Sequence, residues 1–176
     1  MEVVLHTARL VLRRAEAGDL AAMHAVLSDP TATRYWSTPP HTSLEQTERW
    51  LRGMIEQGHD DFVVTVGGEV VGKAGFFGPD DEVGFILHPR VAGRGLGTEA
   101  VHAVIDRAFT VRGRPRVRAD VDPRNRASLG LLAKLGFVET GRAKGTFQVG
   151  DELCDSVYLE VTQATFRAPA RAEARQ

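Results

Sequence analysis

A glycine-rich stretch, Gly93-Arg94-Gly95-Leu96-Gly97-Thr98, is the part of the chain whose residue types and spacing point most directly to chemistry. It follows an apolar run that ends at Leu87, and it opens a helical pattern in which Leu96, Ala100, Val104 and Ala108 recur at a spacing of four. A strand, a glycine turn and a helix in this order let backbone N–H groups approach an anion, and the helix N-terminus adds partial positive charge. The sequence therefore predicts a phosphate site with contacts from Gly93 through Thr98.

Three kinds of phosphate-binding loop compete for this stretch. A P-loop requires a Lys and a Ser or Thr after its last glycine, and a dinucleotide-binding loop requires G-x-G-x-x-G early in a βαβ unit. The spacing Gly93-x-Gly95-x-Gly97 fits neither pattern. The third pattern, Gln/Arg-x-x-Gly-x-Gly/Ala, fits Gly95 and Gly97, although Ala92 stands where Gln or Arg is usual. On this stretch alone, an ordinary glycine turn stays open.

A second segment, from Asn125 to Phe137, has the pattern of a helix with defined ends. Asn125 is suited to be an N-cap, and Gly136 is suited to terminate the helix. Ser128, Leu132 and Leu135 then share one helix face. By itself this segment fits any amphipathic helix of an α/β domain.

In combination and in this order, the two segments resemble the signatures of the GCN5-related N-acetyltransferases (GNAT family). The second segment is similar to N-x-x-A/S-x-x-L-Y/L-x-K-L-G-F. Leu87-His88-Pro89, Thr98-Glu99-Ala100, the opening from Thr7 to Arg13 and Arg34-Tyr35-Trp36 are similar to the branch of ribosomal-protein N-terminal acetyltransferases of the RimJ and RimL type. The resemblance covers about residues 6–163.

Composition and charge set the wider frame. The chain has 176 residues, of which 43% are hydrophobic, which is enough for one domain with a core. The formal net charge of -1 gives no basic field for nucleic acid or an anionic membrane. Its single cysteine, Cys154, excludes an internal disulfide and a cysteine-based zinc site and favours a cytoplasmic location. We expect one domain over residues 1–166, a disordered Ala/Arg tail over 167–176, no metal, and a monomer or a homodimer.

The pattern of apolar residues and turn signals predicts an α/β (α+β) domain in the order β-α-α-β-β-β-α-β-α-β-β. The resemblance implies the GNAT fold, a mixed central sheet of about seven strands with about four helices, in which two strands splay around the cofactor. The predicted elements are strands at 9–14, 62–66, 70–76, 82–87, 117–121, 137–149 and 153–161, and helices at 19–28, 42–58, 95–110 and from 125.

The resemblance implies direct transfer of an acetyl group from acetyl-CoA to a primary amine of a small molecule or a peptide. The pyrophosphate would bind at residues 93–98, with Arg94 beside it, and the backbone of Leu87 and the side chain of Asn125 would contact pantetheine. Many family members carry a Tyr acid where this chain has Leu132. Ser128, one turn earlier on the same face, is then the candidate for contact with the CoA sulfur.

Two carboxylates, Glu82 and Asp120, are candidate bases, although the alternative that each is simply a solvated surface carboxylate stays open. Trp36 and Asp155 are candidate acceptor-binding residues, since Trp36 lies in a proline-containing loop and Asp155 lies in the last strand. Two other classes of function stay open. One is a non-catalytic acyl-CoA-binding or sensor domain, which Ala92 and Leu132 favour. The other is a nucleotide-binding protein that uses the glycine loop.

Overall fold

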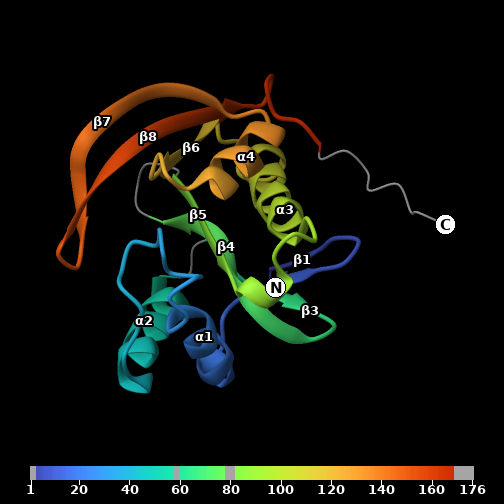
Figure 1. Cartoon of the computed structure of the whole chain (residues 1–176). Helices are drawn as coiled ribbons and strands as arrows, with labels where there is room; N and C mark the ends of the chain where they lie inside the picture. The colour runs from blue at the N-terminus through green and yellow to red at the C-terminus, as the bar shows by residue number, and fades with distance from the viewer. Residues whose placement is uncertain (1–2, 58–59, 78–81, 169–176) are drawn as a thin grey trace.

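The computed structural model describes residues 3–57, 60–77 and 82–168. These residues form one mixed sheet in the spatial order β1-β2-β3-β4-β5-β6-β8-β7 (Figure 1). Its neighbouring strands are antiparallel except for the parallel pair β5 and β6. The strands are β1 (Val4–His6), β2 (Val11–Arg13), β3 (Asp61–Val66), β4 (Glu69–Phe77), β5 (Glu82–Leu87), β6 (Arg116–Val121), β7 (Val138–Val149) and β8 (Glu152–Thr162).

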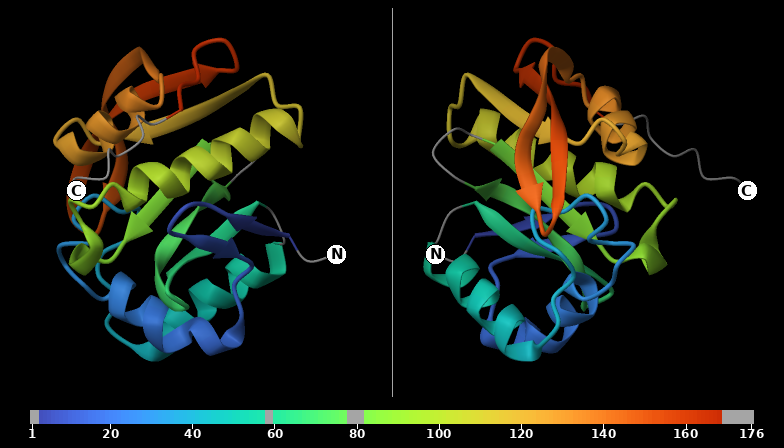
Figure 2. Two further views of the ribbon diagram at one scale, coloured as in Figure 1. Left: turned by 90° about the vertical axis from the view of Figure 1, so that its right-hand side faces the viewer. Right: turned by 60° about the vertical axis from the view of Figure 1, so that its left-hand side comes forward.

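Among the described residues, four α-helices cover the two faces of the sheet, two on each face (Figures 1 and 2). They are α1 (Leu20–Leu27), α2 (Leu44–Gln57), α3 (Leu96–Thr110) and α4 (Arg126–Lys134). On one face, the apolar residues of α3 and α4 pack in one cluster with Phe62 and Val64 of β3. On the other face, α1 and α2 pack in a second cluster with Val63 of the same strand. Successive side chains of β3 thus pack into the clusters on opposite faces of the sheet, as the two-residue period of a strand requires.

Local signals set the ends of several elements. The Oγ of Ser43 accepts a hydrogen bond from the N–H of Gln46, and the side chain of Gln46 accepts one from the N–H of Thr42, so the start of α2 is capped from both directions. Gly67 and Gly68 have φ of 57° and 86°, the left-handed values that a two-residue hairpin turn requires. The predicted hairpin between β3 and β4 is therefore confirmed.

The sheet has one strand more than predicted. The short strand β1 pairs with β2, which occupies only the middle of the strand predicted at 9–14. Asp19 stands at the N-cap position of α1 as expected, but its carboxylate does not cap the helix. It binds the Arg13 guanidinium at 2.7 Å and the backbone N–H of Glu16 at 2.8 Å. A salt bridge to the neighbouring strand is thus preferred over the helix amides.

Most of the tail predicted over 167–176 lies outside the described residues. Its first residue, Arg167, donates its backbone N–H to the carbonyl of Leu135 at 3.1 Å and is therefore attached to the domain. Across the part of the chain that the structure describes, no helix combines the length and the apolar character needed to cross a membrane.

Candidate active site

The parallel strands β5 and β6 separate along their length. Their register contains a single pair, Glu82 opposite Arg118, and no further pair follows toward the carboxyl ends of the strands. On the side of β6, the backbone of Phe85 to Leu87 therefore borders a gap, while its other side pairs with β4. The two halves of the sheet meet at this gap (Figure 1). The splay that the resemblance implied is present in the described residues.

The glycine loop stands at the start of α3, as the sequence predicted. Gly95 is the N-cap residue with φ of 74°, and Gly93 has φ of 73°, both in the left-handed region that favours glycine. The first hydrogen bond that closes α3 runs from the N–H of Glu99 to the carbonyl of Gly95. The amides of Leu96, Gly97 and Thr98 therefore belong to the set that a helix leaves unpaired at its N-terminus, where an anion is stabilised.

Gly97 has a packing role in addition to its amide. A Cβ at this position would lie 3.2 Å from Cδ1 of Leu131 and 3.5 Å from Cδ1 of Leu87. Glycine therefore lets the start of α3 approach both α4 and the end of β5. The predicted cofactor residues Leu87 and Gly97 are thus neighbours in space.

The glycine loop is braced by the N-terminal segment. Glu99, in the first turn of α3, accepts hydrogen bonds from Thr7 Oγ1 at 2.6 Å, from Arg9 N–H at 2.9 Å and from Arg9 Nε at 2.7 Å. Arg9 also donates to the carbonyl of Arg94 inside the loop at 2.7 Å. Burial raises the pKa of Glu99, but the hydrogen bonds from Thr7 and Arg9 outweigh it, so the pKa is lowered. Glu99 is held as a carboxylate that fixes the loop backbone.

At the opposite wall, Asn125 is confirmed as the N-cap of α4. Its Oδ1 accepts a hydrogen bond from the N–H of Ser128 at 3.1 Å, which leaves its side-chain NH₂ as the group that can donate to a ligand. Ser128 and Leu132, one turn apart, face the same cavity. Leu132 is fully buried, so it closes the floor of the cavity and offers no proton.

Residues of β5, β6 and α4 line a cleft of about 670 Å³, which also receives residues from α2, β4 and β7. We use "the cleft" for this cavity below. The structure brings five of the predicted site residues together on its lining: Trp36, Glu82, Asp120, Asn125 and Ser128. Residues 93–98 lie outside the lining, at the start of α3.

The two candidate bases occupy adjacent strands at the point of splay. Asp120 is on β6, and its Oδ1 is buried without a hydrogen-bond partner among the described residues. Burial raises the pKa of Asp120, although a hydrogen bond from Ser156 opposes that effect. Glu82 opens β5, is half-buried and makes an interaction of its own. Of the two, Asp120 has a buried carboxylate oxygen that makes no hydrogen bond within the described residues.

The far end of the cleft carries aromatic rings and a buried ion pair. Lys73 is 3% exposed and lies 2.7 Å from Asp61. Its ammonium is 5.8 Å from the ring centroid of Trp36 and 5.9 Å from that of Phe77. The indole Nε1 of Trp36 is buried and has no partner among the described residues. This end is thus suited to a polar ligand held between rings.

Asp155 does not reach the cleft. It alternates with Cys154 and Ser156 on β8, its Oδ1 accepts a hydrogen bond from Gly145 N–H at 2.9 Å, and it lines a separate, smaller cavity. Its carboxylate therefore stabilises the bulged part of the β7–β8 hairpin.

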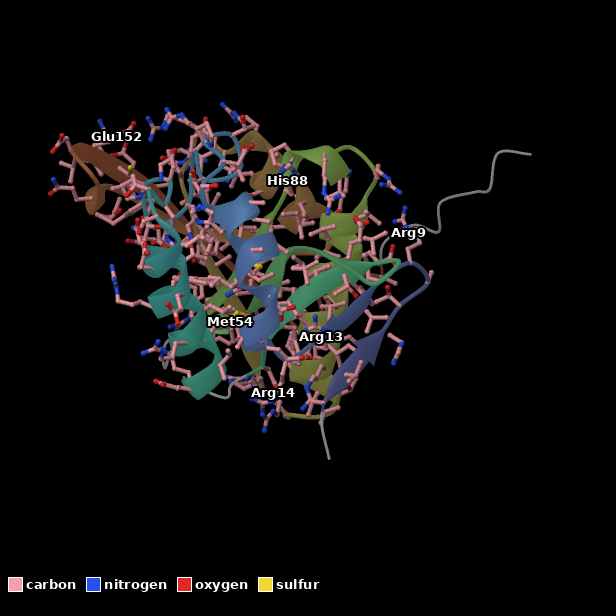
Figure 3. All side chains as sticks on the ribbon, turned by 90° about the horizontal axis from the view of Figure 1, so that it is seen from below. Arg9, Arg13, Arg14, Met54, His88 and Glu152 are labelled. Carbon is pink, nitrogen blue, oxygen red and sulfur yellow. The ribbon has the colours of Figure 1, made fainter. Side chains whose placement is uncertain are left out.

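The tip of this hairpin closes one side of the cleft. Glu152 pairs with Arg34, from the segment between α1 and α2, at 3.3 Å, and it also pairs with Arg124. Both guanidinium groups lie over the ring of Tyr35, at 4.9 Å and 5.7 Å from its centroid. Glu152 lies far from Arg9, so the hairpin tip and the loop brace mark opposite ends of the molecule (Figure 3).

Comparison with known proteins decides the family. The model of the acetyltransferase (GNAT) domain matches residues 9–138 of this chain. The chain belongs to the GNAT acetyltransferase family. The nucleotide-binding alternative for the glycine loop is therefore set aside, since the loop lies within the residues that the family model matches.

Individual relatives support the same family. An uncharacterized N-acetyltransferase p20 of Bacillus licheniformis is 32% identical over 170 residues, covering 88% of this chain and 93% of that protein. Spermidine N(1)-acetyltransferase of Escherichia coli is 25% identical over 163 residues, covering 89% and 88%. The structure of Mycobacterium smegmatis RimJ in complex with CoA-disulfide has the same fold, with a TM-score of 0.78 at 23% identity over 96% of this chain and 91% of that one.

Sequence reasoning missed several residues of this GNAT site. Arg9 and Glu99 appeared only as matches to a branch pattern, and their contact joins segments that are 90 residues apart. Lys73 and Asp61 gave no signal because a lysine and an aspartate on two strands read as surface residues. A Lys at the centre of an otherwise apolar run, as in Val70-Val71-Gly72-Lys73-Ala74, is the cue that could have predicted a paired internal charge.

Proposed function

We propose that this GNAT enzyme transfers an acetyl group from acetyl-CoA directly to a primary amine. The observation that carries the proposal is the joint position of three features. The start of α3, with the helix amides of the glycine loop, lies beside Leu87. Leu87 ends the strand that borders the gap. The gap leads into the cleft, where the carboxyl of Asp120 is buried and has one oxygen without a partner. A phosphate anchor, an extended channel and a proton acceptor thus follow one another.

The chain's own groups fit the cosubstrate. Pyrophosphate oxygens would accept hydrogen bonds from the amides of Gly93 through Thr98, with the Arg94 guanidinium beside them. The backbone of Leu87 and the NH₂ of Asn125 would bind the pantetheine amides. When bound, acetyl-CoA supplies a thioester carbonyl as the electrophile. A bulkier residue than glycine at position 97 would press on Leu87 and Leu131, which shows how tightly this end is shaped.

We assign the proton transfers to Asp120 and Ser128. Asp120 would take the proton from the attacking amine, and Glu82 would help to hold that amine as it arrives. Ser128 would donate a hydrogen bond to the departing sulfur, since Leu132 cannot. A thiol with an ordinary pKa near 8.5 is a good leaving group, so a hydrogen bond in place of full proton donation is adequate. Ser128→Ala is expected to lower kcat more than it weakens acetyl-CoA binding, and unchanged turnover would exclude this role.

The acceptor is a primary amine on a small molecule or at a peptide N-terminus. Relatives include an enzyme named for spermidine, and structural neighbours include RimJ. An α-amine has a pKa of about 7.7–8.0, against about 10.4 for lysine, so a peptide N-terminus needs less help from a base. The half-buried Trp36 and the Lys73–Asp61 pair would line the acceptor's path.

Two measurements in sequence test the proposal. Thermal unfolding is followed with acetyl-CoA, CoA, ATP and NAD in parallel, because a ligand at 100 times its Kd adds about 2.7 kcal/mol of stability. Stabilisation by acetyl-CoA and CoA alone supports the cosubstrate. Release of free CoA thiol is then followed with spermidine, amino acids and peptides that have free N-termini.

The alternative, a non-catalytic acyl-CoA-binding domain, is favoured by Leu132 and Ala92. It predicts the same stabilisation by CoA but no thiol release with any amine. The Kd of acetyl-CoA should then be the same in Asp120→Asn and in the wild type. Failure of CoA to stabilise the protein would contradict both functions.

A further inference from the structure

A glycine stands inside the helix that forms one wall of the cleft. Gly53 belongs to α2, with at least one turn of helix on either side of it. A glycine inside a helix destabilises it relative to alanine, because the glycine backbone loses more conformational freedom on folding. We therefore expect glycine at such a position only where the protein gains from the missing side chain.

The packing of the described residues does not require glycine at this position. A Cβ at Gly53 would meet no atom within 4 Å beyond its chain neighbours and the backbone of its own helix. In the sheet, by contrast, a Cβ at Gly75 would lie 2.3 Å from Asp61, and one at Gly84 would lie 2.3 Å from the ring of Phe77. Gly53 is also absent from the glycines with positive φ. Neither close packing nor backbone conformation accounts for it.

The empty space over Gly53 belongs to the cleft. Gly53 is on its lining together with Arg49, Trp50, Met54 and Gln57, at the three- and four-residue spacing of one helix face. Trp50 is half-buried and Met54 is buried, whereas Arg49 and Gln57 are exposed. The inner part of this face is therefore apolar, and Gly53 leaves a hollow beside it.

The rest of the lining is suited to an apolar group as well. Its buried cation, Lys73, already pairs with Asp61 at 2.7 Å. Aromatic rings line the cleft from five of its elements and loops: Tyr35, Trp36, Trp50, Phe77, Phe85 and Phe147. An alkyl or aromatic group that enters the hollow would leave water for apolar surroundings, which is favourable.

We propose that Gly53 is a specificity-determining residue, which makes room in the cleft for an apolar substituent of the acceptor amine. The proposal rests on the proposed function and names the class of acceptor. The amine would lie toward Asp120, while the alkyl or aromatic group that it carries would lie over the helix backbone at Gly53. A small apolar amine and a peptide with an apolar first side chain share this chemistry.

The test begins with variants that fill the hollow, Gly53→Ala and Gly53→Leu. Gly130 is the matched control, because it lies inside α4, a Cβ there meets no atom within 4 Å, and it is absent from the lining of the cleft. Gly53→Ala and Gly130→Ala should each raise the Tm by about 2–4 °C, since alanine favours a helix interior over glycine. Only the changes at Gly53 should weaken the binding of an amine.

Binding is followed without turnover by tryptophan fluorescence, because both tryptophans of the chain, Trp36 and Trp50, line the cleft. The full-length protein, with and without CoA, is titrated with methylamine, phenethylamine and the peptides Gly-Ala-Ala and Phe-Ala-Ala. The ring-bearing probe with the lower Kd in the wild type distinguishes a small amine from a peptide. For that probe, Gly53→Ala should raise the Kd about tenfold, the effect of one methylene in an apolar pocket, and Gly53→Leu should raise it further. The Kd of methylamine should not change.

Equal Kd values for both ring-bearing probes in Gly53→Leu, Gly130→Leu and the wild type would overturn the proposal. A lower Tm in Gly53→Ala than in the wild type would also overturn it, because the glycine would then serve the packing of the helix. The absence of any fluorescence change in the wild type with all four probes would have the same meaning. If the wild type bound phenethylamine but released no thiol with any amine, the proposed function would fail, and the Kd values would still decide the role of Gly53.

Discussion

The glycine loop, to which we assign the cofactor, and the cleft, to which we assign the acceptor, are built in different ways. We call them the cofactor end and the acceptor end of the site. The cofactor end consists of one continuous loop and the first turn of one helix, which a single brace through Arg9 and Glu99 holds in place. The acceptor end draws on α2, β3, β4, β6 and β7 and is closed by a hairpin tip. Backbone amides dominate the first end, whereas side chains dominate the second. Cofactor binding should therefore depend on local backbone shape, and acceptor choice should depend on side chains from distant segments.

The sharpest test of this difference compares two glycines of equal strain. Gly95 and Gly113 have φ of 74° and 61°, at the two ends of α3, and a Cβ at either meets no atom within 3.4 Å. Gly95→Val and Gly113→Val should each cost about 1–2 kcal/mol for a left-handed side chain. Only Gly95→Val should weaken CoA binding, and the Kd of CoA should rise about a hundredfold if two amide contacts to phosphate are lost. Calorimetric titration with CoA measures this, and an equal loss in both variants would contradict it.

At the acceptor end, the unpartnered indole N–H of Trp36 gives the next effect. Trp36→Phe keeps an aromatic ring but removes this donor. If the acceptor uses the N–H, its KM should rise about fivefold, the equivalent of one hydrogen bond of about 1 kcal/mol. The Kd of CoA should not change. Trp50→Phe, on the same cleft, is the matched control. A more stable protein with unchanged KM would show that the N–H is not used.

The brace formed by Arg9 and Glu99 is expected to have a smaller influence on the affinity for the cofactor. Glu99→Gln keeps the shape of the side chain but weakens the hydrogen bonds from Arg9 and Thr7. Because Glu99 does not touch the ligand, we expect the Kd of CoA to rise about threefold, less than one direct charged hydrogen bond. The KM of the acceptor should stay within error of the wild type. A change in acceptor KM alone would reverse the assignment of the two ends.

The smallest effect is on stability, and it has opposite signs at the two ends. The pKa of Glu99 is lowered, so Glu99 stabilises the fold above its unfolded pKa of about 4.3, and this contribution is lost as the pH falls through the folded value. The pKa of Asp120 is raised, so its contribution is present below about 3.9 and is lost as the pH rises through the folded value. At pH 7.5 we expect a lower Tm for Glu99→Gln and a higher Tm for Asp120→Asn. Both differences in Tm from the wild type should shrink toward pH 4. If the two variants changed Tm in the same direction at pH 7.5, this expectation would be wrong.

The sequence predicted the backbone conformation of the cofactor end well because its signal is local, whereas the binding roles of these residues stay predictions. The glycines, the N-cap Asn125 and the terminator Gly136 each act within a few residues, and all three take the predicted conformations. The element order was predicted for the same reason, apart from the three-residue strand β1, which is too short to show a period.

The acceptor end was less predictable because it depends on register and on long-range contacts. Trp36 reaches the cleft, whereas Asp155 does not and instead lines a separate, smaller cavity. A shift by one residue exchanges the two faces of a strand, and the sequence alone does not show which face is chosen. The pair of Lys73 with Asp61 depends in the same way on the packing of two strands.

The order of the last strands has a consequence for how the molecule is made. β8 is last in the chain, yet it lies between β6 and β7, and β7 pairs with β8 in the described sheet. During synthesis from the N-terminus, Thr7, Arg9 and Glu99 are available long before Glu152. β7 therefore has no place in the sheet until its successor has been made. The cofactor end can mature on the nascent chain, while the acceptor end, with Phe147 in its wall, must wait for release of nearly the whole polypeptide.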